Sequence, residues 1–355
     1  MAGIRDLARE CGVSVATVSR ALNGHPEVSA STRAQVWAVA RRLGYQPSQS
    51  ARALVRGRSD TVGLLWDTGY ENGGRRHPFL QDLMTGIKQA LGENGRHLLL
   101  LNVIGRHDDR QLYLETVRQH QLDGVIMMGV DSRLPSISAL TASGLPCVAF
   151  DQPLVGPHAS YVASDNQAGA AEAVRHLYAL GHRRIATITG PPELMPAAAR
   201  LAGFRDATEE LGLTRPAGYE QLGDFFLDSG YAAGRRLAAL PQRPTAVFAA
   251  GDEMAIGALH AFADLGIATP DEIAVVGFDD IESAGLVRPA LTTVAQDPQR
   301  LGSAAVHLLL DLVAGSAARA PVPPPRTVPT RLVIRGSCGQ VTGGNSGGHS
   351  GADRP

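Results

Sequence analysis

The sequence predicts an all-α helix-turn-helix headpiece at the N-terminus, followed by an α/β core made of two lobes. Three observations support this prediction. Residues 1–46 contain three short helical patterns and no convincing strand. From Thr61 onward, apolar runs such as TVGLLWD, HLLLLNV and DGVIMMG alternate with helical patterns, as parallel strands that are covered on both faces do. A late segment, from about residue 295, has to return to both units, which favours two lobes on a hinge.

The headpiece is predicted as three helices joined by short turns. Gly12 ends the first helix, Ser14 caps the second, Ser29 caps the third, and Gly44 ends it. The residues expected to face the core of this domain are Ile4, Leu7, Ala8, Cys11, Val18, Ala21, Leu22, Val36, Val39, Ala40 and Leu43. Helix, short turn and helix is the arrangement that places a recognition helix in a DNA major groove. We therefore expect residues 1–46 to be a DNA-binding domain.

Residues 47–59 are expected to link the headpiece to the core. Pro47 and Ser48 can begin a short helix that Gly57 ends. A helix of about eight residues is not stable alone in water. We therefore expect this linker to be disordered until DNA or a second subunit orders it.

The core is expected over residues 60–335, with an N-lobe at about 60–164 and 295–320 and a C-lobe at about 165–294 and 321–335. The glycine-rich tail, residues 336–355, is predicted to be disordered. Ligands of such sheets bind beyond the carboxyl ends of the strands. The acids that follow strand-like runs there are Asp67, Asp151, Asp252 and Asp279. These observations predict a ligand cleft between the lobes.

Composition and charge argue against several classes of protein. No run of about 18 apolar residues is present, and the charged start MAGIRDLARE is unlike a signal peptide. The three cysteines form no CxxC pair and the eleven histidines lack metal-ligand spacing, so we expect a reduced, cytoplasmic protein with no metal and no cofactor. Residues 1–59 hold nine arginines against three acids, whereas the remainder holds 24 basic and 31 acidic residues. A basic head on an acidic body indicates a polyanionic partner.

The second helix has an unusual outward face. Val15, Ala16 and Arg20 lie opposite its buried residues. In the major groove, arginine bonds guanine O6 and N7, and small apolar side chains contact the thymine methyl group. We therefore predict that these three residues read bases, the alternative being that the two apolar ones pack on another protein surface. Contacts to DNA phosphates are predicted for Ser14, Thr17, Ser19, Asn23, Arg33 and Tyr45.

Several longer motifs run along the chain: IRDLARECGVSVATVSRALNG, VSASTRAQVWAVARRLGYQPSQSARALV, RLAGFRDA, GDEMAIGAL, VVGFDD and LTTVAQD. Together they resemble the lactose-repressor (LacI/GalR) family of bacterial transcription regulators, and the resemblance spans about residues 3–335. It implies that positions 15, 16 and 20 read bases and that residues 48–56 fold as a hinge helix on DNA. It also implies that Leu54 enters the minor groove, where an apolar wedge can offset the cost of unstacking bases. Without the resemblance, Leu54 could simply pack against its neighbours.

The same resemblance implies a homodimer on double-stranded operator DNA and a core similar to periplasmic binding proteins. We expect an inverted-repeat operator with a central CG step. The predicted effector contacts are Phe79, Asp151, Arg200, Phe225, Asp279 and Gln296. Such a set suits a sugar, because carboxylates accept hydroxyl hydrogen bonds, a forked arginine donates them and an aromatic ring supports the apolar face.

Some of these positions have simpler explanations or depart from the family pattern. Many sugar-responsive members have asparagine where this chain has Gly251, which puts one ligand hydrogen bond in doubt. Arg200 could be a structural ion-pair partner, and either Phe225 or Phe226 could be a core residue. Asp252, and Asp165 in the same way, are expected to cap helices.

We predict a sequence-specific transcriptional regulator, a repressor of carbohydrate-utilisation genes that leaves its operator when a sugar binds the cleft. The alternative is a corepressor-dependent regulator that responds to a nucleobase or another small metabolite. An enzyme on a two-lobed scaffold is less well supported, because the sequence has no GxSxG elbow, P-loop or strand-linked GxGxxG motif. A solute-binding protein of a transporter would need an export signal.

Overall fold

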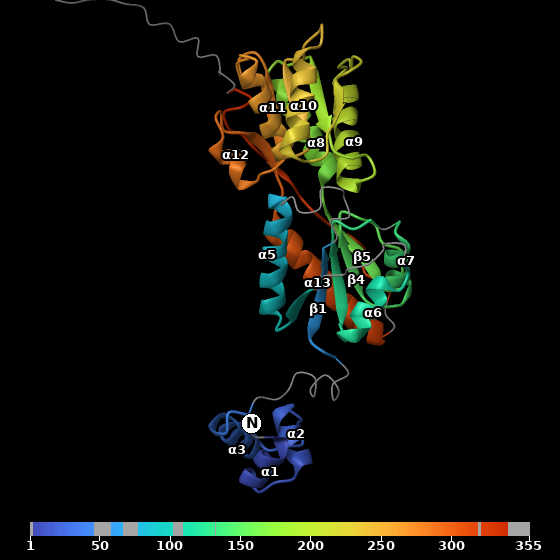
Figure 1. The fold of residues 1–355 in the computed structure, drawn as a ribbon, viewed down its shortest axis with the longest axis vertical. Helices are drawn as coiled ribbons and strands as arrows, with labels where there is room; N and C mark the ends of the chain where they lie inside the picture. The colour runs from blue at the N-terminus through green and yellow to red at the C-terminus, as the bar shows by residue number, and fades with distance from the viewer. Residues whose placement is uncertain are drawn as a thin grey trace, which may run out of the picture.

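The molecule has a small helical headpiece at one end and two α/β lobes stacked beyond it (Figure 1). The computed structural model describes residues 3–45, 58–66, 77–101, 109–131, 133–318 and 321–339. The predicted hinge helix with Leu54, the residue Asp67 and the tail from residue 340 lie outside these ranges.

The headpiece contains α1 (Ile4–Cys11), α2 (Val15–Leu22) and α3 (Ala30–Arg42). The hydroxyl of Ser14 accepts a hydrogen bond from the Thr17 amide at 3.1 Å, so it caps α2 as predicted. Ser29 caps α3 in the same way. The three helices bury a separate apolar cluster, in which Leu7, Val18 and Val36 are fully buried. The predicted helix-turn-helix headpiece is therefore confirmed.

The N-lobe is a six-stranded parallel sheet between helices. Its order is β2-β1-β3-β4-β5-β11, with β1 (Thr61–Trp66), β2 (His97–Leu101), β3 (Gly124–Met128), β4 (Cys147–Phe150), β5 (Ala159–Ser164) and β11 (Arg326–Val328). Alternate strand residues face opposite sides. Leu64, Ile126 and Val148 pack toward α5 (Pro78–Glu93) and α13 (Pro298–Ala318). The other side packs against α6 (Leu112–Gln119) and α7 (Pro135–Ala142).

The C-lobe repeats this layout with the order β7-β6-β8-β9-β10-β12. Its strands are β6 (Ile185–Thr189), β7 (Glu220–Leu222), β8 (Ala246–Ala249), β9 (Ala274–Asp279), β10 (Thr292–Ala295) and β12 (Arg331–Val333), of which β12 is antiparallel. One face is covered by α8 (Asn166–Ala179) and α9 (Met195–Glu210), and the other by α10 (Leu227–Ala238) and α11 (Asp252–Asp264). The short α12 (Glu282–Leu286) follows β9.

Three chain segments cross between the lobes, after β5, after β10 and after β11. Two of them are hydrogen-bonded to each other: the Asp165 amide donates to the Val328 carbonyl at 2.9 Å, and Thr330 Oγ1 donates to the Asp165 carbonyl at 3.3 Å. Asp165 also caps α8 by accepting from the Ala168 amide at 3.2 Å, as predicted. The repeated crossing between the lobes is the connectivity that the sequence predicts.

Two boundaries differ from the prediction. The sequence places residues 321–335 wholly in the C-lobe, but β11 pairs with β5 and covers an edge of the N-lobe sheet, so only β12 joins the C-lobe. Residues 336–339, which the sequence assigns to a disordered tail, are instead folded against the C-lobe. Ser337 is fully buried, accepts from the Thr292 amide at 2.8 Å and donates to the Val275 carbonyl at 2.6 Å.

Candidate functional site

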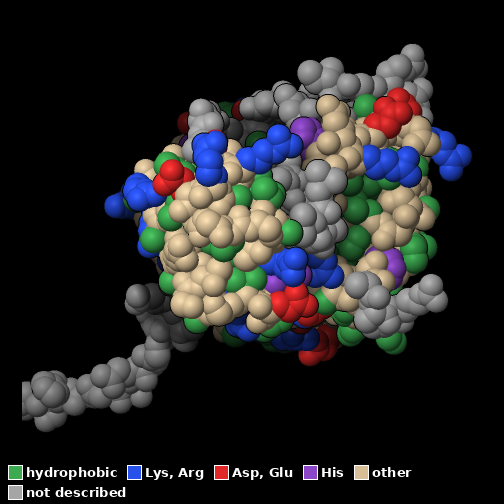
Figure 2. All heavy atoms as spheres, turned by 90° about the horizontal axis from the view of Figure 1, so that it is seen from below, with side chains coloured by type: hydrophobic (Ala, Val, Ile, Leu, Met, Phe, Trp, Pro, Cys, Tyr) green, Lys and Arg blue, Asp and Glu red, His purple; other side chains and the backbone are tan. Residues whose placement is uncertain are grey.

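The outward face of α2 is positioned to meet a partner. Val15 is 42% exposed, and Ala16 and Arg20 are also exposed, while Val18 and Ala21 on the other side are fully buried. The guanidinium of Arg20 lies 3.3 Å from the carboxylate of Glu27. Basic side chains are spread over this end of the molecule, with apolar groups between them (Figure 2). Val15, Ala16 and Arg20 therefore share one accessible surface.

The residues predicted to contact phosphates divide into two groups. Ser14, Thr17, Ser19 and Asn23 lie along α2, where Asn23 Nδ2 also donates to the Ser19 carbonyl at 2.9 Å. Arg33 on α3 donates to the carbonyl oxygens of His25 and Val28, at 2.9 and 3.3 Å. Tyr45 is half-buried against the apolar cluster of the headpiece. Arg33 and Tyr45 thus have structural contacts of their own, and their role on DNA stays a prediction.

A cavity of about 140 Å³ lies between the two lobes. It is at the carboxyl ends of β3, β4 and β9, the place where ligands of parallel sheets bind. Five of the six predicted effector contacts line it: Phe79, Asp151, Arg200, Phe225 and Asp279. The first two come from the N-lobe and the other three from the C-lobe, so a bound molecule would contact both lobes.

Arg200 is held by a buried network before any ligand arrives. One guanidinium nitrogen lies 3.2 Å from Asp279 Oδ1 and donates to the Ala250 carbonyl at 2.6 Å, and Nε donates to Asn166 Oδ1 at 2.8 Å. The side chains of Arg200 and Asp279 are only 4% and 3% exposed. The guanidinium also lies over the ring of Phe278, 3.8 Å from its centre. Arg200 therefore forms a structural ion pair with Asp279 and also lines the cavity.

Gln296 is the predicted contact that does not line the cavity. Its side chain is buried behind Asp279, and Nε2 donates to Asp279 Oδ1 at 2.7 Å. The crossover after β10 carries it to that point, where the acid already occupies the side that faces the cavity. Gln296 therefore orients Asp279, together with the guanidinium of Arg200.

Asp151 ends β4 and brings a second carboxylate to the cavity. Burial raises its pKa to about 6, against the opposing effects of Arg200 and of the Asn166 amide, which donates to Asp151 Oδ1 at 3.3 Å. Asn166 thus joins an acid of the N-lobe to the arginine of the C-lobe. The sequence did not single out Asn166, although it directly follows the predicted helix cap Asp165.

Three residues of the cavity wall have backbone conformations that are rare outside glycine. The φ angles are 50° at Asp151, 70° at Phe225 and 117° at Asp279. Such conformations cost free energy and persist where the surrounding structure requires them, often at binding sites. The backbone at these positions turns the side chains toward the space between the lobes.

His77 is a cavity residue that the sequence did not predict. It precedes α5 in the N-lobe, yet its ring meets the edges of Phe225 and Phe226 of the C-lobe, with centroids 6.5 and 6.1 Å apart. Its Nδ1 is buried and has no hydrogen-bond partner within the described part of the chain. Burial lowers the pKa of His77, which favours the neutral imidazole. Its position against both phenyl rings makes it sensitive to the relative placement of the lobes.

Asp252 does not cap α11, in contrast to the prediction. The cap is Gly251, and the carboxylate of Asp252 turns inward, accepting from the Ile281 amide at 3.0 Å and from Thr293 Oγ1 at 2.6 Å. Burial raises its pKa well above the usual range, and the nearby Asp279 adds to the effect. Asp252 thus fixes the loop after Asp279 and lies outside the cavity wall, as the sequence predicts.

The cavity therefore combines two carboxylates, one guanidinium, an imidazole and three phenyl rings, a set suited to binding a polar molecule with an apolar face. No group of three or more His, Cys, Asp and Glu side chains within the described ranges could hold a metal ion. In the same part of the chain, no helix is long and apolar enough to cross a bilayer.

Comparisons with known proteins identify both the headpiece and the core. Residues 3–48 match the family of bacterial regulatory proteins described as the lacI family, and residues 174–338 match a periplasmic binding protein-like domain. The chain is 35% identical over 311 residues to the ribose operon repressor of Escherichia coli (strain K12), which covers 87% of this chain and 92% of the relative.

Two solved structures extend the likeness to the whole molecule. The crystal structure of the lac repressor dimer bound to operator and the anti-inducer ONPF is similar with a TM-score of 0.79 and 27% identity, over 96% of this chain and 99% of that chain. The complex of the transcriptional regulator CelR with cellobiose is similar with a TM-score of 0.70 and 31% identity, over 95% of this chain and all of that chain.

Proposed function

Because the chain belongs to the LacI family of bacterial regulatory proteins, we propose that it represses carbohydrate-utilisation genes and leaves its operator when a sugar binds between the lobes. Membership in the family makes it a DNA-binding transcriptional regulator that acts as a dimer. The carbohydrate effector, the release on binding and the residues that carry each step are the proposal.

The observation that carries the sugar assignment is the charge arrangement of the cavity. Arg200 is already paired with Asp279, and Asp151 adds a further acid whose pKa is about 6. An effector with a carboxylate or phosphate would find no unpaired positive charge in the part of this wall that the structure describes. Hydroxyl groups, by contrast, can donate to the carboxylates, and the rings of Phe79 and Phe225 can support the apolar face of a sugar ring. The ribose operon repressor and the CelR–cellobiose complex are relatives whose names refer to sugars.

The DNA end of the proposal rests on α2. Arg20 can form two hydrogen bonds to a guanine, and Val15 and Ala16 can contact thymine methyl groups. A twofold dimer presents two such helices, so the operator is an inverted repeat. Leu54, which lies outside the described residues, is assigned to the minor groove at the centre of that repeat.

We place the dimer contact along the edge strands β2 and β7. Leu100 on β2 is 55% exposed and Leu222 on β7 is 61% exposed, and both strands end their sheets. Exposed apolar edges of this kind need a cover in a protein that stays unaggregated. A second copy packed there contacts both lobes, so a change in the angle between the lobes alters the separation of the two linkers.

A thermal-shift screen of the full-length protein tests the effector. The panel contains D-ribose, cellobiose, D-glucose, ribose 5-phosphate and hypoxanthine, each at several concentrations. We expect a neutral sugar to raise the melting temperature, as any ligand selective for the native state does. The same sugar should weaken binding to the upstream DNA of its own gene in a gel-shift assay. A response to hypoxanthine or to the sugar phosphate alone would overturn the assignment.

A further inference from the structure

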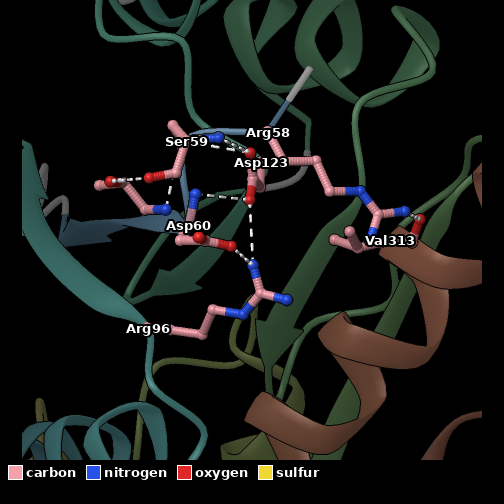
Figure 3. Close-up of polar contacts among 7 residues, drawn as sticks. Arg58, Ser59, Asp60, Arg96, Asp123 and Val313 are labelled. Atoms are coloured by element: carbon pink, nitrogen blue, oxygen red, sulfur yellow. Dashed lines mark hydrogen bonds and ion pairs between the residues drawn. The ribbon is translucent and has the colours of Figure 1, made fainter. Parts of the chain in front are cut away.

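The first core residues after the linker are held by one carboxylate (Figure 3). Asp123, which precedes β3, accepts hydrogen bonds from the Ser59 amide at 2.8 Å, from Ser59 Oγ at 3.2 Å and from the Asp60 amide at 3.0 Å. Its side chain is only 7% exposed. A single acid, which directly precedes the neighbouring strand β3, therefore holds the chain at the point where the linker ends and β1 begins.

Two arginines complete this junction (Figure 3). Arg96, which precedes β2, reaches both Asp60 and Asp123, and lies 3.3 Å from the latter. Arg58 donates to the Val313 carbonyl of α13 at 3.4 Å. Asp60 itself has a φ of 55°, so its backbone makes a sharp turn that needs support. The junction thus ties together the amino ends of β1, β2 and β3.

The strand that begins directly after Asp123 reaches the effector cavity. β3 runs from Gly124 to Met128 with every residue buried, and Gly129 and Val130 directly after it line the cavity. Five strand residues span about 17 Å at about 3.3 Å each. A rigid, central strand therefore has the cavity at one end and the linker contact at the other.

We propose that Asp123 is a positioning residue for operator recognition: it fixes the point at which each linker leaves the dimer core and so sets the half-site spacing that the dimer accepts. This inference rests on the proposed function, because it requires a dimer on an inverted repeat. Asp123 contacts no DNA in this role. It also makes the linker move with the N-lobe when the lobes change their angle.

The magnitudes favour a measurable effect. Freeing residues 58–60 from the core adds up to three residues of slack, or about 10 Å at 3.3–3.6 Å each. One base pair more or less between half-sites moves them by about 3.4 Å along the helix and turns them by about 35°. The added length of about 10 Å is larger than the shift of about 3.4 Å for one base pair. A protein without the Asp123 contacts should therefore tolerate half-site spacings that the wild type rejects.

The experiment uses the full-length dimer and no effector. An inverted repeat is first selected by the wild-type protein from a random DNA pool, and its spacer is then lengthened or shortened by one base pair. We expect wild-type affinity to fall at least about tenfold on the altered repeats, and that of Asp123→Asn to fall less than about threefold. In this variant the amide replaces one acceptor oxygen, so a donor of Ser59, Asp60 or Arg96 loses its partner.

Two further variants separate positioning from simple stabilisation. Asp311→Asn removes an exposed carboxylate that pairs with Arg326 at 2.7 Å elsewhere in the same lobe, and it should keep the wild-type preference. Ser59→Ala removes the hydroxyl, which donates to Asp123 and accepts from the Thr61 amide at 3.2 Å. It keeps the backbone contact of Ser59 with Asp123, leaves no buried charge, and should give an intermediate preference. The ratio of two affinities measured on one folded protein is insensitive to a lower melting temperature.

The outcomes are distinct. A wild-type spacing preference in both Asp123→Asn and Ser59→Ala would overturn the inference while leaving the regulator intact. If the wild-type protein selected no DNA at all, the proposed function would fail and the inference with it.

Discussion

The phenyl ring of Phe225 lies where a side chain of residue 251 would begin: a Cβ atom on Gly251 would be 3.1 Å from Phe225 Cδ1. A Cβ atom on Gly190 would be closer still, 2.3 Å from Cε2 and Cζ of the same ring. Gly190 follows β6 and Gly251 follows β8. Because neither has a side chain, the ring of Phe225 can pack closely against both. The φ angle of Phe225 is 70°. A longer side chain at position 251, such as the asparagine expected from the family resemblance, would therefore compete with the ring for this space.

Gly190→Ala should therefore displace the ring and disturb the cavity. Overpacking of this kind costs about 1–3 kcal/mol. The clash is relieved only if the ring of Phe225 moves away from residue 190. We expect the sugar found in the screen to bind at least about tenfold more weakly, a loss of about 1.4 kcal/mol, while operator affinity without sugar stays unchanged. Isothermal titration and gel shifts measure the two quantities. Gly92→Ala is the control, because a Cβ there meets no atom within 4 Å; equal sugar affinities in the two variants would contradict the prediction.

Arg200→Ala should lower both stability and effector binding, for separable reasons. Removing the guanidinium leaves the carboxylate of Asp279 buried without its charge partner, and breaking a buried pair in this way typically costs about 3–5 kcal/mol. The double variant Arg200→Met with Asp279→Asn removes both charges and should recover most of the melting temperature.

If Arg200 also binds the sugar, the double variant stays unresponsive to it in spite of its restored stability. Thermal unfolding with and without sugar measures both effects. A stable double variant with wild-type sugar affinity would show that the pair is structural only.

The fold was largely predictable because its strongest signals are local. Apolar runs such as those of β1 and β3 and the caps Ser14 and Ser29 were all recognisable in the chain. The final strand was also predicted and corresponds to β12, whereas β5, β7 and β11 were not. β7 and β11 have three residues each, and the polar ends of β5 give little propensity, so their pairing depends on neighbours far along the sequence.

The same distinction holds for the cavity. The motif residues of the cavity could be predicted from a family pattern. The position of His77 could not, because its ring packs against Phe225 and Phe226, which lie about 150 residues further along the chain. Asp252 shows the opposite error. An acid at the start of a helix usually caps it, but here the partners of the carboxylate are 29 and 41 residues away. Tertiary contacts of this kind cannot be derived from local pattern.

Asp151 should make stability depend on pH in a defined direction. Its pKa is raised from 3.8 to about 6 by burial, so the native state holds the proton more tightly than the unfolded chain does. The stabilising contribution of the protonated acid is then complete below the unfolded pKa and is lost as the pH rises through about 6. Asp151→Asn, which stays neutral, should exceed the wild type in stability by an amount that grows between about pH 4 and pH 7.

Melting temperatures of both proteins across that range measure the difference, which cancels the contributions of other groups such as His77. A difference that stayed constant with pH would mean that Asp151 titrates normally. Sugar affinity should change in the opposite sense: if the ionised carboxylate accepts a hydroxyl, wild-type binding weakens as the pH falls below about 6.

Glu27→Gln should strengthen operator binding. In the structure Arg20 is 3.3 Å from Glu27, and both side chains are well exposed, 49% and 71%. An exposed pair of this kind contributes little to folding, so the melting temperature should not change. On DNA, however, Arg20 has to leave the carboxylate to reach a guanine, and the carboxylate repels the phosphates. We expect an affinity gain of about two- to fivefold, measured by fluorescence anisotropy at two salt concentrations.

Glu10→Gln provides the matched control, because Glu10 pairs with Arg42 at 2.6 Å between α1 and α3 and does not contact Arg20. Its effect on operator affinity should be smaller than that of Glu27→Gln. Weaker binding by Glu27→Gln would reverse the interpretation. In that case Glu27 would hold Arg20 in the orientation that reads the base, and its loss would lower specificity for the selected operator more than affinity for random DNA.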